Sequence, residues 1–386
     1  MLIDDLSTPC LLVDRERLQR NLRAMQTLAD TNDVALRPHA KTHKCPSLAR
    51  RQIEQGAVGL TVATVAEAET FVGAGAEDVR VAYPVVGRDK HERLAALRKD
   101  ARISFTVDTE AAAEQAAAFY ADRNQTAEVL LEIDVGHGRC GVPWSADVVP
   151  LARRIAEQDG LRLAGILTHA GQAYGGPRED ESAEAALCRI SRQERDRMLD
   201  VAVQLAQADV PGVEPGSFAI SIGSTPTMAC FANAEQDGFR ITEIRPGNYV
   251  FNDTIQVDLA AADLDDCALT VYTTVVSKRR DASGIERAYV DAGKKVLTTD
   301  TAPTSPGYGT VLYNASFMRP HPHATVAKLS EEHGWMRVPG GATFGVGDRL
   351  QIVPNHACVT TATQSELHVV DGEEVVDTWA VDARGW

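Results

Sequence analysis

The sequence predicts a (β/α)8 barrel followed by a mostly antiparallel β domain, and three observations support this fold class. The chain has 386 residues, more than the roughly 250–300 over which one hydrophobic core keeps growing, so two domains are expected. Up to about residue 255, eight short β-rich runs alternate with segments of helix-forming composition. Beyond that point, strand-like segments follow one another with turn residues between them and little helical periodicity.

The eight β-rich runs have the length and residue types of buried strands. They cover residues 35–40, 58–64, 79–85, 103–108, 128–134, 163–169, 218–224 and 241–247. Between them, segments such as 89–100, 109–122 and 184–208 have helix-forming composition. A doubly wound open sheet is the competing fold, but the glycine-rich turn that binds dinucleotides in that fold is missing.

The C-terminal part of the chain is predicted to be a separate β domain. Its strand-like segments are residues 267–277, 287–291, 348–353 and 366–380. No internal repeat or low-complexity linker interrupts the chain. We therefore expect a barrel over residues 19–255 and a β domain over residues 256–386.

Composition excludes several classes of partner. Lys and Arg number 39 against 54 Asp and Glu, a net charge of -15, which argues against nucleic acid or an anionic membrane surface as the main partner. No apolar run approaches the roughly 20 residues of a membrane span. The first ten residues, MLIDDLSTPC, are acidic where a signal peptide is basic and then apolar, so a cytoplasmic location is expected. The seven cysteines lack CxxC spacing, which favours reduced thiols over a disulfide framework.

Chemically versatile residues collect where the predicted barrel strands end, the edge at which barrel enzymes build their active sites. The first strand continues into a basic turn that contains His39, Lys41 and His43. A lysine at this edge could form a Schiff base with a carbonyl compound or with pyridoxal phosphate. A solvated basic turn is the alternative interpretation.

Two late strand ends resemble a phosphate-binding cup. Gly223, Ser224 and Thr225 follow the seventh strand, and Gly247 and Asn248 follow the eighth. Small residues, backbone N–H groups and hydroxyls suit a phosphate dianion, and late strands often hold phosphate in barrels. A reactive lysine on the first strand with a phosphate cup on the last two is a layout that suits pyridoxal phosphate.

At these motifs the chain resembles the D-serine dehydratase / D-threonine aldolase family, pyridoxal phosphate enzymes of fold type III that are related to alanine racemase. The matching motifs, which cover nearly the whole chain, are RPHAKTHK at 37–44, EIDVGHGRCGV at 132–142, GILTHAGQAY at 165–174, SIGSTPT at 221–227, EIRPGNYVFND at 243–253 and VPNHACVT at 353–360. The resemblance implies a (β/α)8 barrel, a β domain that residues 1–18 join, a D-amino acid substrate and a homodimer.

The resemblance also implies residue roles. Lys41 matches the Schiff-base lysine and would take the α-proton. Arg139 would lie near the phenolic oxygen of the cofactor, with an ion pair to Asp134 as the alternative. Arg245 would face the pyridine nitrogen and disfavour its protonation, with a structural salt bridge as the alternative. His169 would lie beside the ring or shuttle protons, with a buried hydrogen-bonded histidine as the alternative. The expected cofactor-binding residues are Lys41, His39, Arg139, His169, Tyr174, Gly223, Ser224, Thr225, Arg245, Gly247, Asn248 and Tyr249.

A metal site is predicted at His356 and Cys358. If this segment is a strand, residues two apart point to the same face, so one ion can reach both side chains. A thiolate with an imidazole favours zinc, with manganese or magnesium as alternatives. The pair alone is weak, but the resemblance implies it, because the dehydratase branch carries this pair here. The metal would bind the β-hydroxyl of the substrate as a Lewis acid.

Together these residues predict a lyase of D-3-hydroxy amino acids that depends on pyridoxal phosphate and a divalent metal. The favoured reaction is dehydration of D-serine, D-threonine or D-threo-3-hydroxyaspartate to a keto acid and ammonia. A D-threonine aldolase is the alternative, although that branch carries His-x-Asp at the metal position. An amino-acid racemase, which needs the lysine but not the metal pair, is the third option. A 3-carboxylate on the substrate would suit Arg319, His321 and His323.

Overall fold

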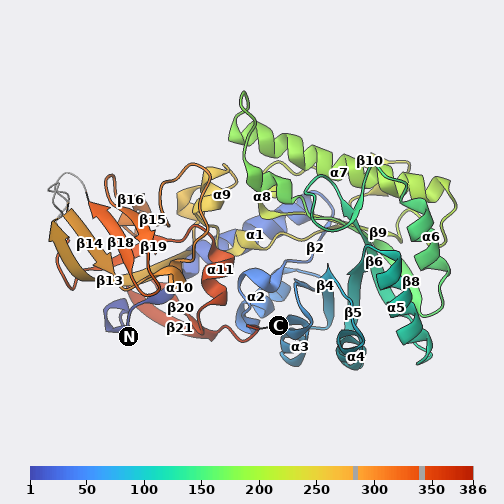
Figure 1. Cartoon of the computed structure of the whole chain (residues 1–386), viewed down its shortest axis with the longest axis horizontal. Coiled ribbons are helices and arrows are strands. Elements are labelled where there is room, and N and C mark those ends of the chain that lie inside the picture. Colours follow the sequence, from blue (N-terminus) through green and yellow to red (C-terminus); the bar gives the residue numbers. More distant parts are fainter. Residues whose placement is uncertain (281–285, 339–343, 386) are drawn as a thin grey trace. The chain divides into compact units, whose positions relative to one another are not determined.

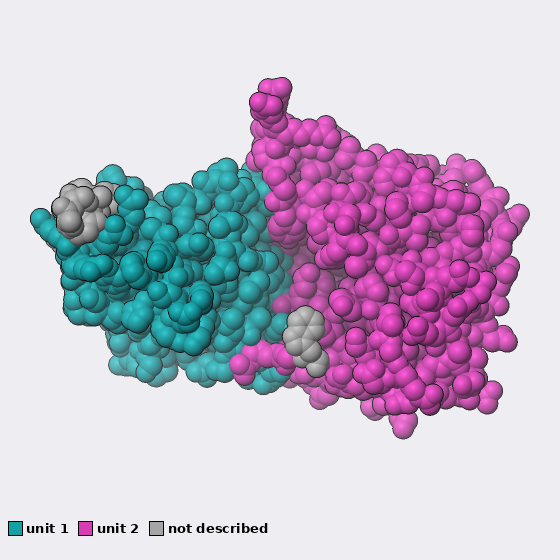
Figure 2. Space-filling model, in the orientation of Figure 1, with its two compact units in different colours: residues 1–24, 42–47, 248–382 teal, residues 25–41, 48–247, 383–386 magenta. Residues whose placement is uncertain are grey.

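The computed structural model describes residues 1–280, 286–338 and 344–385, and Figure 1 labels many of its helices and strands. The chain splits into two compact units, coloured separately in Figure 2. The β unit comprises residues 1–24, 42–47 and 248–382, and the barrel unit comprises residues 25–41, 48–247 and 383–386. Among the described residues, none of the helices combines the length and apolar character that crossing a membrane requires.

The barrel unit contains one sheet whose eight main strands all pair in parallel. In spatial order these strands are β2 (Ala35–Leu36), β12 (Glu243–Ile244), β9 (Ala219–Ile222), β8 (Leu161–Leu167), β6 (Ala127–Asp134), β5 (Arg102–Val107), β4 (Asp78–Pro84) and β3 (Leu60–Val62). A parallel bridge between His39 and Thr61 joins the two ends of this order, next to β2 and β3. Each strand overlaps a predicted run, with β8 beginning two residues before its run at 163–169, so the predicted (β/α)8 barrel is confirmed.

Helices follow the barrel strands along the chain and lie around the outside of the sheet (Figure 1). They are α2 (Pro46–Gln55), α3 (Val65–Gly73), α4 (Arg88–Leu97), α5 (Glu110–Ala121), α6 (Val149–Glu157), α7 (Ala183–Gln207) and α8 (Thr225–Met228). Helix α1 (Arg15–Thr31) follows β1, and its residues from 25 onward belong to the barrel unit. Side-chain caps set several of their starts: the hydroxyl of Thr109 accepts a hydrogen bond from the backbone N–H of Ala112, at 3.3 Å. Short strands β7 (Val142–Pro143), β10 (Glu235–Gln236) and β11 (Phe239–Arg240) complete this unit.

The β unit is built on a mostly antiparallel sheet, as predicted for the C-terminal part of the chain. Its strands are β1 (Cys10–Asp14), β13 (Leu269–Arg280), β14 (Glu286–Val290), β15 (Thr310–Asn314), β16 (Arg319–Pro320), β17 (Thr325–Leu329), β18 (Gly334–Val338), β19 (Arg349–Val353), β20 (Glu366–Asp371) and β21 (Glu374–Ala380). Strand β1, from the start of the chain, lies between β13 and β20. Helices α9 (Thr254–Asp258), α10 (Lys294–Leu297) and α11 (Ala357–Ala362) join these strands.

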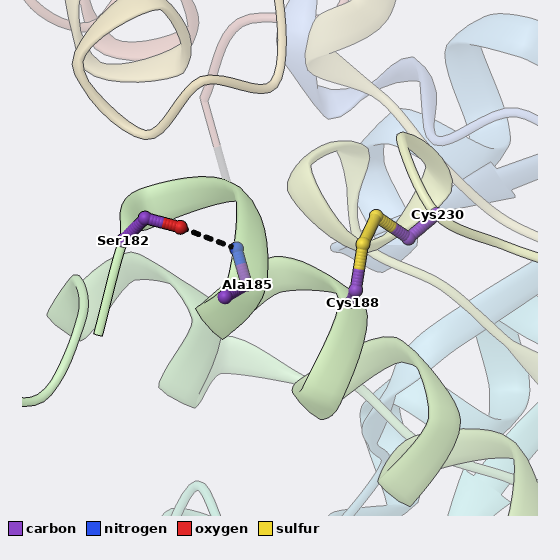
Figure 3. The surroundings of a disulfide bond; sticks show 4 residues. All are labelled: Ser182, Ala185, Cys188 and Cys230. Carbon is purple, nitrogen blue, oxygen red and sulfur yellow. Dashed lines mark hydrogen bonds between the residues drawn. A yellow bond between two sulfur atoms is a disulfide. The ribbon is translucent and has the colours of Figure 1, made fainter.

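A disulfide between Cys188 and Cys230 corrects the expectation that all thiols are reduced (Figure 3). Cys188 lies on α7, and Cys230 follows α8. The two cysteines are 42 residues apart in sequence, and their Cα atoms are 4.9 Å apart, within the range that a disulfide spans. Their pairing depends on how α7 packs against α8, which residue spacing does not encode.

We expect removal of this disulfide to destabilise the barrel unit. The bond closes a 42-residue loop, so replacing both cysteines by serine should lower the free energy of unfolding by about 2–4 kcal/mol. Urea unfolding with and without a reductant measures this, and the double variant is its own control because reductant should leave it unchanged. The non-reduced, denatured protein should show five free thiols; seven would mean that the bond does not form.

Candidate active site

In the barrel unit, the predicted cofactor residues gather at one edge of the sheet. Parallel strands present their carboxyl ends at the same edge, so residues that follow different strands meet there. These residues follow β2 (His39, Lys41), β6 (Arg139), β8 (His169, Tyr174), β9 (Gly223, Ser224, Thr225) and β12 (Arg245, Gly247). Because each of these residues follows a parallel strand, the position of the strands in the sequence is enough to place these cofactor residues at the same edge.

Lys41 lies in the short 3-10 helix η2 (Ala40–Thr42) that follows β2. Two hydrogen bonds hold the backbone that leads into it: the His39 N–H donates to the carbonyl of Pro246 at 3.0 Å, and the Lys41 N–H donates to Nδ1 of His39 at 3.4 Å. The Lys41 side chain is half-buried. This arrangement fixes where the lysine leaves the barrel edge.

His169 is held neutral by its surroundings. Burial and the nearby cations Lys41 and Arg139 lower its pKa well below the usual value. Its ring lies 5.8 Å from the ring of His137, edge-on, and 6.4 Å from the ring of Tyr174. A neutral imidazole beside Lys41 can accept or relay a proton.

Arg139 and Asp134 do not form an ion pair within the described parts of the chain. Asp134 instead accepts hydrogen bonds from the backbone N–H groups of Gly136, His137 and Gly138, at 2.7–3.1 Å. Burial would raise the pKa of Asp134, but these donors lower it. Asp134 therefore shapes the loop that carries Arg139. Burial raises the pKa values of Glu132 and Cys140, Arg139 lies close enough to oppose that rise, and its cofactor role stays a prediction.

Arg245 is buried, with 4% of its surface exposed, and one of its donors has no partner among the described residues. Its Nη1 donates to the Ser221 hydroxyl at 2.5 Å, and its Nη2 donates to the carbonyl of Thr168, whereas Nε is unsatisfied. Neither contact is a salt bridge. A buried donor without an acceptor is destabilising, so this N–H fits a bound group that brings an acceptor, such as an unprotonated pyridine nitrogen.

A buried network of charges lies behind Arg245 and fixes its position. Ser221 donates to the carboxylate of Glu243, which also pairs with Arg80 and with Nε of Arg37, the latter at 2.6 Å. Burial would raise the pKa of Glu243, but the two arginines lower it to about 2. Glu243 therefore stays anionic and accepts the hydrogen bond of the Ser221 hydroxyl, which leaves the Ser221 oxygen free to accept from Arg245.

The loop after β9 is tied to helix α7 by a buried carboxylate. Glu194 is 0% exposed and accepts hydrogen bonds from the Gly223 N–H at 2.9 Å and the Thr227 hydroxyl at 3.0 Å. Burial raises the pKa of Glu194 to about 7. Gly223 has φ +120°, a backbone conformation that other residues rarely adopt. A Cβ at this position would also lie 3.0 Å from the backbone nitrogen of Arg245, so the loop needs glycine. The Ser224 hydroxyl of this loop already contacts the carbonyl of Ala170 at 3.4 Å and the Thr227 hydroxyl at 3.2 Å, so a phosphate role for Ser224 and Thr225 stays a prediction.

In the β unit, His356 and Cys358 are close together but do not lie on a strand, which corrects the expected geometry. Strand β19 ends at Val353, before Pro354, whose ring removes the next ladder donor. His356 precedes α11, and Cys358 lies in its first turn. The Ala357 N–H donates to the buried Asp253 at 2.8 Å, which starts the helix.

The two side chains nevertheless interact. Burial would lower the pKa of His356, but the charge of Cys358 and a hydrogen bond to Asp300 raise it to about 11, so a metal ion that binds here would displace a proton from the ring. The sulfur of Cys358 lies 3.2 Å from the hydroxyl of Thr42. An imidazole and a thiol that face each other form a donor set suited to zinc. Within the described residues no group of three or more His, Cys, Asp or Glu side chains could hold a metal ion, so this pair would leave coordination positions open.

Two further sets of residues lie elsewhere in the β unit. Asn248 and Tyr249, predicted to bind the cofactor, belong to this unit, where the Asn248 amide donates to Asp253 at 2.5 Å. His321 lines a cavity of about 690 Å³, together with Tyr313 and Phe344. Neither His356 nor Cys358 is among the described residues that line this cavity, so it does not support a role of His321 at the metal pair.

Sequence reasoning missed four carboxylates that position the predicted residues. They are Glu194, Glu243, Asp253 and Asp300. Each contacts a residue distant in sequence, so residue spacing alone carries no signal for them. An isolated acidic residue within an apolar strand, such as Glu243, is the one sequence sign that could have indicated a buried partner.

Comparisons with known proteins match both parts of the chain. Residues 13–254 match the family model of the alanine racemase N-terminal domain, and residues 268–370 match that of a putative serine dehydratase domain. A D-threo-3-hydroxyaspartate dehydratase from Delftia sp. is 34% identical over 99% of this chain and 98% of that protein. A D-threonine aldolase from Arthrobacter sp. is also 34% identical, over 98% of this chain and 93% of that protein. A solved structure of a cysteine-to-alanine mutant of D-threo-3-hydroxyaspartate dehydratase, in the metal-free form, has a TM-score of 0.87 at 33% identity and covers 100% of both chains.

Proposed function

This chain belongs to the family that joins an alanine racemase N-terminal domain to a serine dehydratase domain, and from that membership we propose that it is a lyase of D-3-hydroxy amino acids. The proposed reaction is dehydration to a keto acid and ammonia, with pyridoxal phosphate and a divalent metal as cofactors and a homodimer as the active unit. The observation that carries the dehydratase is the pair His356 and Cys358, which the structure places together at the start of α11.

The cofactor would be held by residues of the barrel unit. Lys41 would bind it covalently, the hydroxyls of Ser224 and Thr225 would contact its phosphate, and the unsatisfied Nε of Arg245 would donate to its ring nitrogen. When bound, pyridoxal phosphate withdraws electrons from the α-carbon of the substrate and so acidifies the α-proton. A cation at the ring nitrogen weakens that withdrawal, so a leaving group that departs easily becomes more important.

Lys41 and His169 would handle the proton. The Lys41 Nζ would take the α-proton as the general base. His169 is neutral, because burial and the cations Lys41 and Arg139 lower its pKa, so it can accept a proton from Lys41. The proton would then leave with the departing β-hydroxide as water, which returns Lys41 and His169 to their starting protonation states.

His356 and Cys358 would hold the divalent metal, whose Lewis acidity stabilises the departing β-hydroxyl. Zinc is the proposed ion because sulfur and nitrogen donors suit it, with manganese or magnesium as alternatives. Loss of the α-proton and the β-hydroxyl as water, followed by hydrolysis, gives the keto acid and ammonia. Two protein ligands leave positions at which the substrate hydroxyl can bind.

Aldol cleavage is the second candidate, because the Arthrobacter D-threonine aldolase is as similar to this chain as the Delftia dehydratase. In an aldolase the β-hydroxyl is deprotonated and the Cα–Cβ bond breaks, so the same lysine and metal could serve either reaction. The resemblance assigns His-x-Asp to the aldolase branch, so Cys358 favours dehydration.

Product analysis on D-threonine tests the proposal. We expect 2-oxobutanoate and ammonia in a reaction that needs both pyridoxal phosphate and zinc or manganese, with L-threonine unreactive as the matched control. Glycine and acetaldehyde would identify an aldolase and show that Cys358 does not select dehydration. If D-threonine, D-serine and D-threo-3-hydroxyaspartate all give neither product set, the lyase proposal fails.

Light scattering of the same sample tests the homodimer. It should give twice the 41.6 kDa chain mass, and a mass equal to that of one chain would exclude the homodimer.

A further inference from the structure

The carboxylate of Asp300 contacts the ring of His356, 56 residues away along the chain. Its Oδ2 lies 2.5 Å from Nδ1 of His356. Asp300 follows helix α10, whereas His356 precedes helix α11. Because Nδ1 is engaged by the carboxylate, Nε2 is the ring nitrogen that remains for a metal ion.

The segment that carries Asp300 is tied to the same place by a second contact. Asn355, which directly precedes His356, is 1% exposed. Its amide donates to the backbone carbonyl of Asp300 and to that of Gly307, both at 2.9 Å. The ring of His356 and the residue before it are therefore both held by the segment 300–307, which restricts the orientation of the ring.

This arrangement has a chemical consequence for a metal ligand. A carboxylate that accepts a hydrogen bond from Nδ1–H keeps the proton on that nitrogen, leaves the lone pair on Nε2 and makes the imidazole a stronger donor. The other side chain of the pair has a separate partner, because the Thr42 hydroxyl lies 3.2 Å from the sulfur of Cys358. The imidazole is thus oriented by Asp300 and not by its neighbour Cys358 alone.

We propose that Asp300 is a positioning residue that orients His356 for metal binding. Asp300 would not touch the metal; it would act through the His356 ring. The inference rests on the proposed function, because it requires His356 to be a metal ligand. It predicts that the affinity of the protein for zinc depends on a carboxylate outside the HAC motif at 356–358.

Zinc affinity of the full-chain enzyme, loaded with pyridoxal phosphate and stripped of metal by chelation, tests the inference. Competition with a coloured zinc chelator measures the dissociation constant for the wild type, Asp300→Ala, Asp300→Asn and His356→Ala. We expect Asp300→Ala to bind zinc about 10–100-fold more weakly. Asp300→Asn should lose less, because its amide oxygen can still accept from Nδ1–H. His356→Ala should lose zinc binding.

A matched control variant distinguishes the loss of His356 positioning from the loss of any one negative charge in the β unit. Glu366 on β20 lies 3.7 Å from Nε2 of His368 in the same unit, so Glu366→Gln removes a carboxylate beside a histidine that has no proposed metal role. Its zinc affinity should equal that of the wild type. The melting temperature of each metal-free variant identifies loss of folding. With cobalt in place of zinc, Asp300→Ala should change the visible ligand-field bands, which a purely structural role would leave unchanged.

Two results would overturn the inference, and only one of them would also overturn the metal site proposed at His356. If Asp300→Ala binds zinc as the wild type does while His356→Ala does not, Asp300 does not position the ligand, but the metal proposal stands. If His356→Ala itself binds zinc as the wild type does, the metal site proposed at His356 is wrong, and the inference fails with it.

Discussion

Replacement of Lys41 by alanine will lower turnover of every D-3-hydroxy amino acid substrate by at least about 1,000-fold, within the range that general bases contribute, and will abolish the absorbance of covalently bound pyridoxal phosphate. Two functions are lost together, because Lys41 is proposed both to hold the cofactor and to take the α-proton. Visible absorbance of the purified enzyme and initial rates of keto acid formation measure the two effects.

Lys44 provides the matched control for this prediction. It lies three residues further along the same RPHAKTHK motif and is also half-buried. Lys44→Ala should keep both the absorbance and the turnover. Bound absorbance that survives in Lys41→Ala but disappears in Lys44→Ala would transfer the cofactor role to Lys44.

Replacement of Cys358 by alanine will separate the metal from the cofactor. We expect this variant to retain pyridoxal phosphate, because Lys41 and Arg245 are unchanged, but to lose tight zinc binding. Without the Lewis acid, about 4 kcal/mol of stabilisation of the leaving hydroxyl disappears, which corresponds to about a 1,000-fold loss of dehydration rate. Metal analysis of the dialysed enzyme and the rate of keto acid formation measure the two effects.

Cys10 is a suitable control for Cys358, because it belongs to the same unit and its thiol is not a metal ligand. Burial raises the pKa of Cys10 to about 12, so the thiol stays protonated. Cys10→Ala should bind zinc and turn over as the wild type does. If chelation of the wild-type enzyme leaves dehydration unchanged, the metal has no part in the reaction.

The barrel was predictable from the sequence because its pattern is local. Each strand is a short buried apolar run, such as residues 128–134, and each is separated from the next by a helix-forming segment. Parallel pairing then follows from the β-α-β order, and it puts Lys41, His169 and Arg245 at the same edge. Site residues that follow strands are therefore visible to sequence reasoning.

Local pattern was misleading where a single residue or a distant contact decides the structure. The metal pair at His356 and Cys358 was argued from the geometry of a strand, but Pro354 ends β19 and Asp253 accepts the N–H that starts α11. The disulfide between Cys188 and Cys230 was not predicted, because the two cysteines meet only when α7 packs near α8.

The sequence by itself determined the alternation of strands and helices, the β domain and the identities of the residues that can react: Lys41 at a strand end, and an imidazole and a thiol two residues apart. These properties depend on short-range periodicity and on the chemistry of side chains. Only the tertiary structure decided which carboxylates support them. Glu243 reaches Arg245 through Ser221, and Asp300 reaches His356 across 56 residues, because such contacts form only when the chain has folded.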